Sequence, residues 1–320
     1  MFVLGIAGSP RRGGNSDRLL AEFVDEAGRL GAETETIVPS SLAIRPCIEC
    51  RTCEETGLCA IDDDMQRIYG LMRRADVIVA ASPIFFYGVT AFLKAVIDRT
   101  QCLWARRHLL KLSDPGAPSR KGVFLSVGAT KGEKLFEGAT LTMKYFFDAV
   151  GASFVGGLYY RRIEHPGDVE KHPTALADAR DLAGTVVRPF IVRKKILFLC
   201  RRNACRSQMA WGFTRFLAGE GFEAASAGDT PAAEVNADMV AVMAERGIDM
   251  GFVSPRSVTD ALKAGDPDIV ISMGCMDACP VVPGAEIADW GIADPEGKPV
   301  AFMRETRDEI ERRVTTLVGS

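Results

Sequence analysis

Short, almost wholly apolar segments alternate along this chain with longer segments of helical period, and the alternation runs in two separate series. Strands that are apolar on both faces and joined by helical crossovers build parallel sheets with helices on both sides. The first series therefore predicts a doubly wound α/β domain. Its expected strands lie near 2–7, 33–38, 76–81, 122–127 and 152–159, and its expected helices near 15–30, 62–74, 89–101, 133–149 and 170–187.

The second series follows residues 187–195, a segment that carries a proline and a run of basic residues. It predicts a smaller α/β domain. Its expected strands lie near 196–199, 222–227 and 268–273, and its expected helices near 207–219, 236–246, 257–263 and 301–317. We expect a first domain at 1–187, a linker at 188–193 and a second domain at 194–320.

Charge and hydropathy argue against two kinds of partner. Lysine and arginine total 39 against 42 aspartate and glutamate, for a net charge of −3, and neither half of the chain is strongly basic. A nucleic acid or an anionic membrane held by bulk electrostatics is therefore not expected. The chain has no run of about 18 apolar residues and no basic segment ahead of an apolar one at its start. We expect a cytoplasmic protein without a membrane-spanning helix.

Cysteine is the residue type whose distribution points to chemistry. Eight of the nine cysteines lie in tight clusters within a long chain, which is typical of metal or redox sites and not of a disulfide framework. The three histidines, His108, His165 and His172, lie outside every cluster. Catalysis by a Ser-His-Asp or Cys-His arrangement therefore has no support in the sequence.

The expected first strand runs into a loop of small residues, GSPRRGGNS, and then into a helix. Backbone N–H groups and hydroxyls at such a helix N-terminus can bind a phosphate. The loop lacks the Gly-Lys-Ser/Thr of a nucleotide-hydrolysing P-loop and the GxGxxG of a dinucleotide fingerprint. A plain strand–helix turn is the alternative. The polar candidates for a phosphate site are Ser9, Arg11, Asn15 and Ser16.

Two further loops belong at the same edge, because ligands of open α/β sheets bind outside the carboxyl ends of the strands. One loop contains SPIFFYG and follows the expected strand 76–81; the other follows the expected strand 122–127. Aromatic residues here can wall a flat ring, and they can equally be core residues. The candidates in the two loops are Pro83, Ile84, Phe85, Phe86, Tyr87, Gly88, Ser126 and Gly128.

In combination, the segments GSPR..GNS, SPIFFYG and LKAVIDR resemble the NADPH-dependent FMN reductase group of the flavodoxin-like fold, over about residues 1–160. The resemblance implies a flavodoxin-like parallel sheet, bound FMN, and NAD(P)H as the reductant. It places the FMN phosphate on Ser9–Ser16 and the flavin ring beside Pro83–Gly88 and Ser126–Gly128.

Four cysteines lie in one expected loop at C-x2-C-x2-C-x5-C spacing, namely Cys47, Cys50, Cys53 and Cys59. This compact spacing suits the thiolate ligands of one iron–sulfur cubane. Zinc is an alternative, although its sites usually pair two CxxC knuckles across a longer span, and unmetallated thiols are another. The spacing resembles that of iron–sulfur flavoproteins, which implies a [4Fe-4S] cluster near FMN at a subunit interface. A homodimer or higher oligomer through the flavin domain is then expected.

A second anion-binding loop follows the expected strand 196–199. Cys200 and Arg206 flank it at a spacing that lets backbone N–H groups, a helix N-terminus and a bidentate guanidinium surround a tetrahedral oxyanion. The same positive field favours the thiolate of Cys200, which can then act as a nucleophile. Ser207 can donate to that thiolate, and Asn203 can hold the loop. The alternative is a buried structural cysteine beside a surface arginine.

A late loop and a second cysteine pair extend this candidate site. Asp294 precedes a proline and suits a general acid, although Asp-Pro pairs also form plain turns. Cys275 and Cys279 follow the expected strand 268–273, at the sheet edge where Cys200 is expected. A phosphatase needs one cysteine, whereas arsenate reduction needs two more thiols, because each turnover consumes two electrons.

The segments CRRNACRSQMA, SAGDTPAAEVN, MGCMDACPVVPG and DWGIADPEGK, in this order, resemble arsenate reductases of the low-molecular-weight tyrosine phosphatase fold, over residues 194–320. The resemblance implies that Cys200 attacks arsenate or a phosphate-like oxyanion, Arg206 binds its oxygens and Asp294 protonates the leaving hydroxyl. It makes Cys275 and Cys279 the resolving thiols, with thioredoxin or a low-molecular-weight thiol as partner.

The two resemblances together predict a fused enzyme that reduces arsenate to arsenite. Electrons pass from NAD(P)H to FMN and then, directly or through the cluster, to the oxidised thiols. Two alternatives stay open: a low-molecular-weight phosphatase joined to a flavoprotein, and a redox or metalloid sensor. Trp211 departs from the pattern of the second family, which usually has glutamate there.

Overall fold

The computed structural model describes residues 1–263, 265–274 and 282–319 of the 320-residue chain. The chain divides into two compact units. Unit 1 comprises Met1–Lys111 and Arg120–Ile191, and unit 2 comprises Leu112–Ser119 and Val192–Ser320. Each unit has its own sheet and its own hydrophobic core.

Unit 1 is built on a wholly parallel sheet with the strand order β2-β1-β3-β4-β5. This is the order of flavodoxin-like folds, so the predicted doubly wound sheet is confirmed. Its strands are β1 (Phe2–Ala7), β2 (Glu33–Ile37), β3 (Val77–Pro83), β4 (Lys121–Gly128) and β5 (Ser153–Arg161). Its helices are α1 (Asn15–Arg29), the 3-10 turn η1 (Pro39–Ser41), α2 (Thr52–Thr56), α3 (Met65–Arg74), α4 (Ala91–Arg99), α5 (Gln101–His108), α6 (Glu137–Ala149), α7 (Asp168–Lys171) and α8 (Ala175–Ile191).

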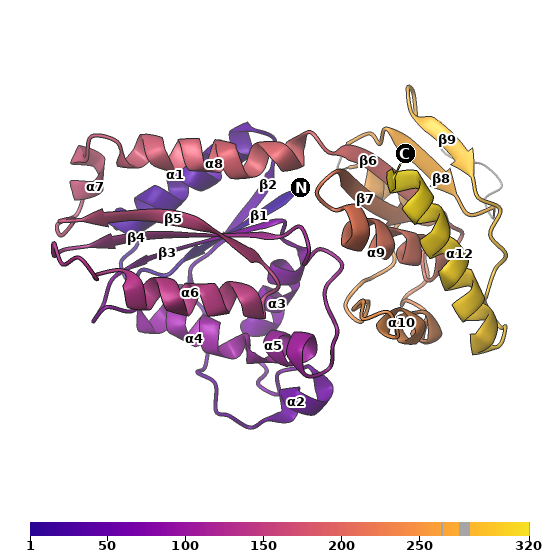
Figure 1. The fold of residues 1–320 in the computed structure, drawn as a ribbon, viewed down its shortest axis with the longest axis horizontal. Coiled ribbons are helices and arrows are strands. Elements are labelled where there is room, and N and C mark those ends of the chain that lie inside the picture. The colour runs from indigo at the N-terminus through magenta and orange to yellow at the C-terminus, as the bar shows by residue number, and fades with distance from the viewer. Residues whose placement is uncertain (264, 275–281, 320) are drawn as a thin grey trace. The chain divides into compact units, whose positions relative to one another are not determined.

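Helices cover both faces of this sheet, with α1 and α8 on one side and α3 to α6 on the other (Figure 1). Side chains alternate between the faces along each strand. Leu4 and Ile6 of β1 thus lie in the core on the α3–α6 side, and Val3 lies in the core on the α1–α8 side. Because the central strands are buried on both faces, their sequences are continuous apolar runs. Polar groups that bind a ligand have to come from the loops beyond the strand ends.

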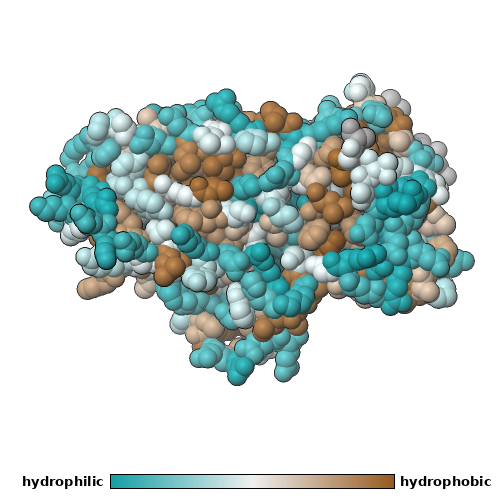
Figure 2. Space-filling view, viewed as in Figure 1, coloured by the Kyte–Doolittle hydropathy of each residue, from teal (hydrophilic) through white to brown (hydrophobic). Residues whose placement is uncertain are grey.

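The edge strand β5 contains a bulge. Its pairing with β4 shifts register between Gly122 and Phe124, and Gly156 takes a positive φ of 111°. A bulge increases the local twist of an edge strand and interrupts regular pairing. Hydrophobic side chains gather along this edge and the neighbouring α8 in the space-filling view (Figure 2), and Val155 in the bulge is 45% exposed. The edge is therefore apolar but irregular.

Unit 2 has a smaller parallel sheet with the strand order β7-β6-β8-β9. Helices α9, α10 and α12 pack on one face and α11 on the other, which confirms the predicted smaller α/β fold. The strands are β6 (Lys194–Leu199), β7 (Phe222–Ala227), β8 (Ile269–Ser272) and β9 (Glu286–Asp289). The helices are α9 (Arg206–Ala218), α10 (Ala237–Ala244), α11 (Val258–Leu262) and α12 (Val300–Gly319).

Strand β9 has no counterpart among the expected elements. Its sequence, EIAD, contains no apolar run, because it is an edge strand and most of it is exposed. Its pairing with β8, which places Ser272 opposite Asp289, makes it a strand. A local pattern cannot reveal such a non-local pairing. The strand matters here because it leads directly into the loop that carries Asp294.

The end of α8 lies later than the sequence pattern indicates. The helix continues through Pro189 and overlaps the expected linker at 188–193. A proline inside a helix removes one backbone hydrogen bond. Val187 and Phe190 on either side of it are buried in the core of unit 1, and this packing keeps the last turn helical.

Residues 112–119 also differ from the expected domain limits. The sequence pattern places them within the first domain, whereas they belong to unit 2. There the N–H of Ser113 donates to the carbonyl of Gly247 at 2.8 Å, and the N–H of Asp249 donates to the carbonyl of Ser113 at 2.9 Å. These are long-range backbone contacts, and the local sequence carries no signal for them.

The close pairing of β4 and β5 gives a stability test. A Cβ atom at Gly157 would lie 1.9 Å from the carbonyl oxygen of Phe124, so Gly157→Ala is expected to lower the free energy of unfolding by about 1–3 kcal/mol through overpacking. Gly28 in α1 has open space around it, so Gly28→Ala is expected to raise it by about 0.5–1 kcal/mol. Urea denaturation followed by circular dichroism measures both. Equal changes in the free energy of unfolding for the two substitutions would contradict the close packing of Gly157 against Phe124.

Candidate functional site

Loops of unit 1 meet at the edge of the sheet where its parallel strands end. The register of β1 and β3 places Ala7 opposite Ala81, so the loops that follow leave the sheet side by side. The N–H of Gly8 donates to the carbonyl of Ala81 at 2.8 Å, and the Thr90 hydroxyl donates to the carbonyl of Gly8. A Cβ atom at Gly8 would lie 2.7 Å from that Ala81 oxygen, so only glycine allows this approach. Thr90 is missing from the predicted site residues.

The N-terminus of α1 is open to an anion. Its N-cap residue, Gly14, makes no side-chain capping bond. The Asn15 amide turns to another loop, where its Oδ1 accepts from the N–H of Gly167 at 3.1 Å and its Nδ2 donates to the carbonyl of His165 at 2.9 Å. The N–H groups of a first helical turn have no intrahelical acceptors, so they and the helix dipole can bind a phosphate. Asn15 acts here by fixing the loop.

The remaining polar residues of this loop divide into a buried and an exposed set. Ser9 and Ser16 are buried, and Ser9 closes the turn, since its Oγ accepts from the N–H of Arg11 at 3.1 Å. Arg11 itself is exposed. Burial raises the pKa of Asp17, whose Oδ2 accepts from the N–H of Gly13 at 3.1 Å. Ser9 and the backbone N–H groups at the start of α1 could hold the phosphate group of FMN, whereas the Asn15 side chain is taken up by residues 165–167.

The aromatic segment after β3 forms a strained tight turn. Phe85 and Gly88 exchange two backbone hydrogen bonds, of 3.0 and 2.9 Å. The two residues between them, Phe86 and Tyr87, have φ values of 49° and 62°, a region that non-glycine residues rarely adopt. Backbone strain of this kind clusters at ligand-binding sites. The turn holds three aromatic rings at least half exposed at the sheet edge, as a wall for a flat ring requires.

Two of the predicted ring contacts have structural roles. The N–H of Ile84 donates to the carbonyl of Val127 at 2.9 Å, which joins the aromatic segment to the end of β4. The Ser126 hydroxyl is fully buried and donates to the carbonyl of Ser82 at 2.7 Å. Pro83 and Gly128 are the last residues of β3 and β4. Ile84 and Ser126 therefore join the ends of β3 and β4 through hydrogen bonds to backbone carbonyls.

The four clustered cysteines line one cavity of about 700 Å³ in unit 1. Cys47 and Cys50 are exposed, Cys53 and Cys59 are half-buried, and all four thiols are free. Burial raises the pKa of Cys53, and the Cys59, Cys50 and Cys47 thiols raise it further. Within residues 1–263, 265–274 and 282–319, however, no group of three or more His, Cys, Asp or Glu side chains is arranged to hold a metal ion.

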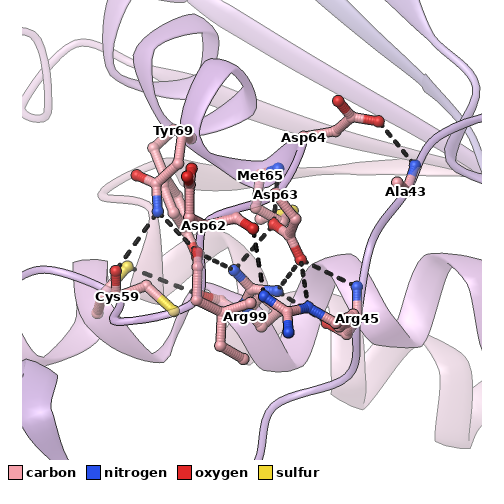
Figure 3. A network of polar contacts seen from close by, with 12 residues as sticks. Ala43, Arg45, Cys59, Asp62, Asp63, Asp64, Met65, Tyr69 and Arg99 are labelled. Carbon is pink, nitrogen blue, oxygen red and sulfur yellow. Dashed lines mark hydrogen bonds and ion pairs between the residues drawn. The ribbon is translucent and has the colours of Figure 1, made fainter.

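A buried ion pair lies beside this cavity (Figure 3). Arg99 donates to both oxygens of Asp63, at 2.6 and 3.1 Å, and the two side chains are 0% and 5% exposed. Burial opposes both charges, yet the hydrogen bonds between the two groups raise the pKa of Arg99 and lower that of Asp63. Arg99 also donates to the carbonyls of Arg45 (2.8 Å) and Ile61 (3.2 Å), which tie together the two ends of the cysteine loop.

The Arg99–Asp63 pair is not among the predicted site residues. An arginine in LKAVIDR and an aspartate in IDDDM carry no signal of their own, because their meeting is a tertiary contact. The Nε atom of Arg99 is buried and has no hydrogen-bond partner in the part of the chain that the structure describes. Four free thiols around one cavity and an unpaired donor beside it fit a sulfur-rich anionic group.

In unit 2, Cys200 follows β6 and Arg206 begins α9, and the loop between them surrounds the thiol. The Sγ of Cys200 lies 3.0 Å from the hydroxyl of Ser207. Since that hydroxyl accepts a hydrogen bond from Nδ2 of Asn203 at 2.8 Å, its own hydrogen is directed to the sulfur. The structure therefore places Ser207 in contact with the thiol and Asn203 in contact with Ser207, and their catalytic roles stay predictions.

Asn203 is the central residue of a buried network. It has a φ of 48° and is fully buried. Its Oδ1 accepts from the N–H of Arg256 at 2.9 Å and from Nε2 of Gln208 at 3.1 Å. Gln208 and Arg256 are absent from the predicted site, although Gln208 follows Ser207 directly in the motif. The network fixes a loop conformation that an L-residue does not adopt readily.

Arg206 and Asp294 face each other across the mouth of the loop. Arg206 is buried and donates to a carboxylate oxygen of Asp294 at 2.5 Å and to the carbonyl of Ile292 at 2.8 Å. Asp294 is half exposed. Arg202 pairs with Glu296 at the rim. A cavity of about 220 Å³ is lined by Cys200, Arg202, Ala204, Cys205, Arg206, Glu234, Val235, Asn236, Asp294 and Glu296.

Of the other cysteines of unit 2, the structure describes Cys205 and does not describe Cys275 and Cys279. Cys205 has a buried thiol that contacts the sulfur of Met303 at 3.3 Å, and burial raises its pKa, so this thiol is poorly suited to be a nucleophile. The predicted resolving thiols, Cys275 and Cys279, lie outside the described residues. The last described residues before them run beside the end of β6, where the N–H of Met273 donates to the carbonyl of Leu199 at 3.0 Å.

Comparisons with known proteins match each unit separately. Residues 1–160, half of the chain, match the family model of NADPH-dependent FMN reductases, and residues 195–320 match that of low molecular weight phosphotyrosine protein phosphatases. A glutaredoxin arsenate reductase of Synechocystis is 36% identical over 39% of this chain and 97% of its own length. The chain belongs to the NADPH-dependent FMN reductase family and, in unit 2, to the arsenate reductases.

Both predicted family resemblances are thus confirmed. An iron-sulfur flavoprotein of Methanosarcina thermophila is 37% identical to the FMN reductase unit over 41% of this chain. The match spans 65% of that protein, so the chain covers less than two thirds of it. A solved arsenate reductase in the phosphate-binding state is 34% identical over 39% of this chain and 97% of its own, with a TM-score of 0.36. Among the described residues, no helix is long and apolar enough to cross a membrane.

The Asn203 network of the arsenate reductase unit gives a test of the site. Asn203→Ala is expected to weaken binding of the oxyanion vanadate at least about tenfold, because it strains the backbone and removes hydrogen bonds worth about 1 kcal/mol each. Asn203→Gly keeps the backbone conformation and loses only the amide, so its effect is expected to be smaller. Isothermal titration measures both. Wild-type affinity in Asn203→Ala would show that the network does not hold the site.

Proposed function

We propose that this chain reduces arsenate to arsenite at Cys200, with electrons that NAD(P)H delivers through FMN in unit 1. The observation that carries the proposal is the set of Cys200, Arg206 and Asp294 around one cavity of about 220 Å³, with the Ser207 hydroxyl 3.0 Å from the thiol. A nucleophile, an oxyanion-binding guanidinium and an acid then act on one small tetrahedral anion.

The first step uses all three groups. The Cys200 thiolate, stabilised by the Ser207 hydroxyl, forms a sulfur–arsenic bond while one arsenic–oxygen bond breaks. Arg206 holds two arsenate oxygens in place of its present contact with Asp294, and Asp294 protonates the departing oxygen, which leaves as water. General acid catalysis of this kind contributes about 10²–10⁴-fold to a rate.

The second step is the reduction itself. A second thiol attacks the sulfur of Cys200, the sulfur–arsenic bond breaks, and its electron pair goes to arsenic, which leaves as arsenite. One disulfide forms for each arsenate, so two electrons come from two thiols. We assign the resolving thiols to Cys275 and Cys279. The end of β8 runs beside the end of β6, and the described chain before this pair ends at Gly274, next to Met273, whose N–H donates to the carbonyl of Leu199.

The disulfide requires a reductant for each turnover. The open N-terminus of α1 and the aromatic turn at Phe85–Gly88 would hold the phosphate and the ring of FMN, a cofactor that takes a hydride from NAD(P)H and passes on single electrons or pairs. Cys47, Cys50, Cys53 and Cys59 would hold a [4Fe-4S] cluster as a one-electron carrier. Joining donor and acceptor in one chain raises their effective concentration.

External partners complete the proposal. Thioredoxin or a low-molecular-weight thiol can serve as an alternative reductant of the disulfide, and the Synechocystis relative is named for glutaredoxin. A reduced thiol system of this kind belongs to the cytoplasm, where disulfides do not persist. We assign a homodimer or higher oligomer to the FMN reductase unit.

A phosphatase is the second candidate, because Cys200, Arg206 and Asp294 alone suffice for hydrolysis of a phosphate monoester. In that reaction water, and not a thiol, releases the oxyanion from Cys200. The same cavity would then accept phosphate in place of arsenate, and Cys275 and Cys279 would have no catalytic part.

Whether the protein reduces arsenate without an external thiol is tested with purified protein, FMN, NADPH and arsenate alone. Steady formation of arsenite is expected, since unit 1 supplies the electrons, and Cys200→Ser is expected to abolish it. Arsenite quantified by chromatography with elemental detection is the readout. If arsenite forms only after thioredoxin or a small thiol is added, unit 1 does not supply the electrons, although the reductase assignment stands.

The choice between reductase and phosphatase rests on the cysteine pair. A Cys275→Ser, Cys279→Ser double variant is expected to lose arsenate reduction and to keep any hydrolysis of p-nitrophenyl phosphate, because only the first reaction needs resolving thiols. Thr316→Ser, at an exposed position of α12 in unit 2, is the control. Full arsenate reduction in the double variant would refute the assigned thiols.

A further inference from the structure

The buried Arg99 guanidinium has one donor that the protein leaves unused. Its two terminal nitrogens donate to Asp63, to the carbonyl of Arg45 and to the carbonyl of Ile61. Its Nε is buried without a partner, and Arg99 is 0% exposed at the side chain. Among the described residues only one other buried side-chain atom, Oδ1 of Asp17, shares this condition. An unpaired buried donor is costly, so a native one points to a missing acceptor.

The surroundings of Arg99 indicate what that acceptor is. Arg99 lines the cavity of about 700 Å³ together with all four clustered cysteines. After Asp63 and Tyr69, the Cys59 thiol is among the groups that raise the pKa of Arg99, and no other thiol is among the main ones. Cys59 belongs to the same polar network through its backbone carbonyl, which accepts from Gln66, and Gln66 and Arg99 both donate to the carbonyl of Ile61 (Figure 3). The sulfur atoms of the cysteines that line the same cavity are therefore the acceptors that we consider.

Arg99 is also held so that it cannot turn away. The Tyr69 hydroxyl donates to the carbonyl of Arg99 at 2.9 Å, and the Cys102 thiol donates to the same carbonyl at 3.6 Å. The pair with Asp63 fixes the other end of the side chain. Main chain and guanidinium are thus fixed independently, which leaves Nε in one position before any ligand binds.

We propose that Nε of Arg99 donates a hydrogen bond to sulfur at the Cys59 corner of the iron–sulfur group, and thereby raises its reduction potential. The inference rests on the cluster assigned above to Cys47, Cys50, Cys53 and Cys59. Hydrogen bonds to the sulfurs and nearby charge are the protein's means of setting such potentials, because both stabilise the more negative, reduced form. Arg99 is a positioning residue, and the negative charge of Asp63 partly offsets the positive charge of Arg99.

The test uses the full-length holoprotein, reconstituted anaerobically with iron and sulfide. Arg99→Lys keeps a positive charge near Asp63 and removes Nε, so the midpoint potential of the cluster is expected to fall. A tenfold lower ratio of reduced to oxidised cluster at a fixed potential corresponds to about 59 mV for one electron. Asp63→Asn removes a negative charge and keeps Nε, so the potential is expected to rise. Dye-mediated titration followed by electron paramagnetic resonance measures both.

Arg180→Lys is the matched control, because Arg180 pairs with Glu22 between α8 and α1, on the opposite face of the sheet. It is expected to leave the potential unchanged. Iron and sulfide content is measured for every variant. Wild-type protein that binds no iron and sulfide overturns the cluster assignment. A wild type that holds the cluster, together with an Arg99→Lys potential equal to wild type, overturns the role of Arg99 alone.

A second measurement covers the case in which Arg99→Lys does not incorporate the cluster. Wild-type protein labelled with ¹⁵N-arginine and reduced is studied by pulsed electron paramagnetic resonance. A hyperfine coupling from one arginine Nε to the cluster is expected, and Arg180→Lys is expected to keep it. The absence of any arginine coupling in a protein with full iron content overturns the proposal.

Discussion

Parallel strand pairing is the constraint on which both units depend. Each strand of both sheets runs parallel to its neighbours, so every connection crosses over through a helix or long loop and the carboxyl ends of the strands meet at one edge. This pairing places three loops at the carboxyl ends of strands: the phosphate loop after β1, the aromatic turn after β3 and the Cys200 loop after β6. The strands themselves are apolar and buried, and the loops carry the polar groups.

Both candidate sites hold an irregular loop with a buried polar group. In unit 2, Asn203 fixes the loop around Cys200 through three neighbours, and in unit 1 the Arg99–Asp63 pair joins the two ends of the cysteine loop. Removing one partner of a buried ion pair costs about 3–5 kcal/mol, since the other charge is left uncompensated. These groups are therefore strong determinants of local conformation, and a ligand meets a loop that is already in place.

The surroundings of each cysteine distinguish reactive thiols from structural ones. Burial raises the pKa of Cys102 to about 11 and also raises that of Cys205, so these two are suited to packing. Cys50 is exposed, and hydrogen bonds from Thr52 lower its pKa, which suits a ligand thiolate. Cys200 combines burial with a hydroxyl donor at 3.0 Å. One residue type thus serves three purposes, because environment and not identity sets the thiolate fraction.

The sequence by itself determined the two α/β folds, their families and the loops that carry chemistry, because apolar runs, helical periods and compact motifs such as CRRNACRS are local patterns. Strand β9, the continuation of α8 through Pro189 and the membership of residues 112–119 in unit 2 depend on contacts between distant segments, and only the tertiary structure decided them. The same holds for Arg99, Asp63, Thr90 and Arg256. Their side chains acquire roles through burial and pairing with residues far away in the chain, and no local pattern encodes such meetings.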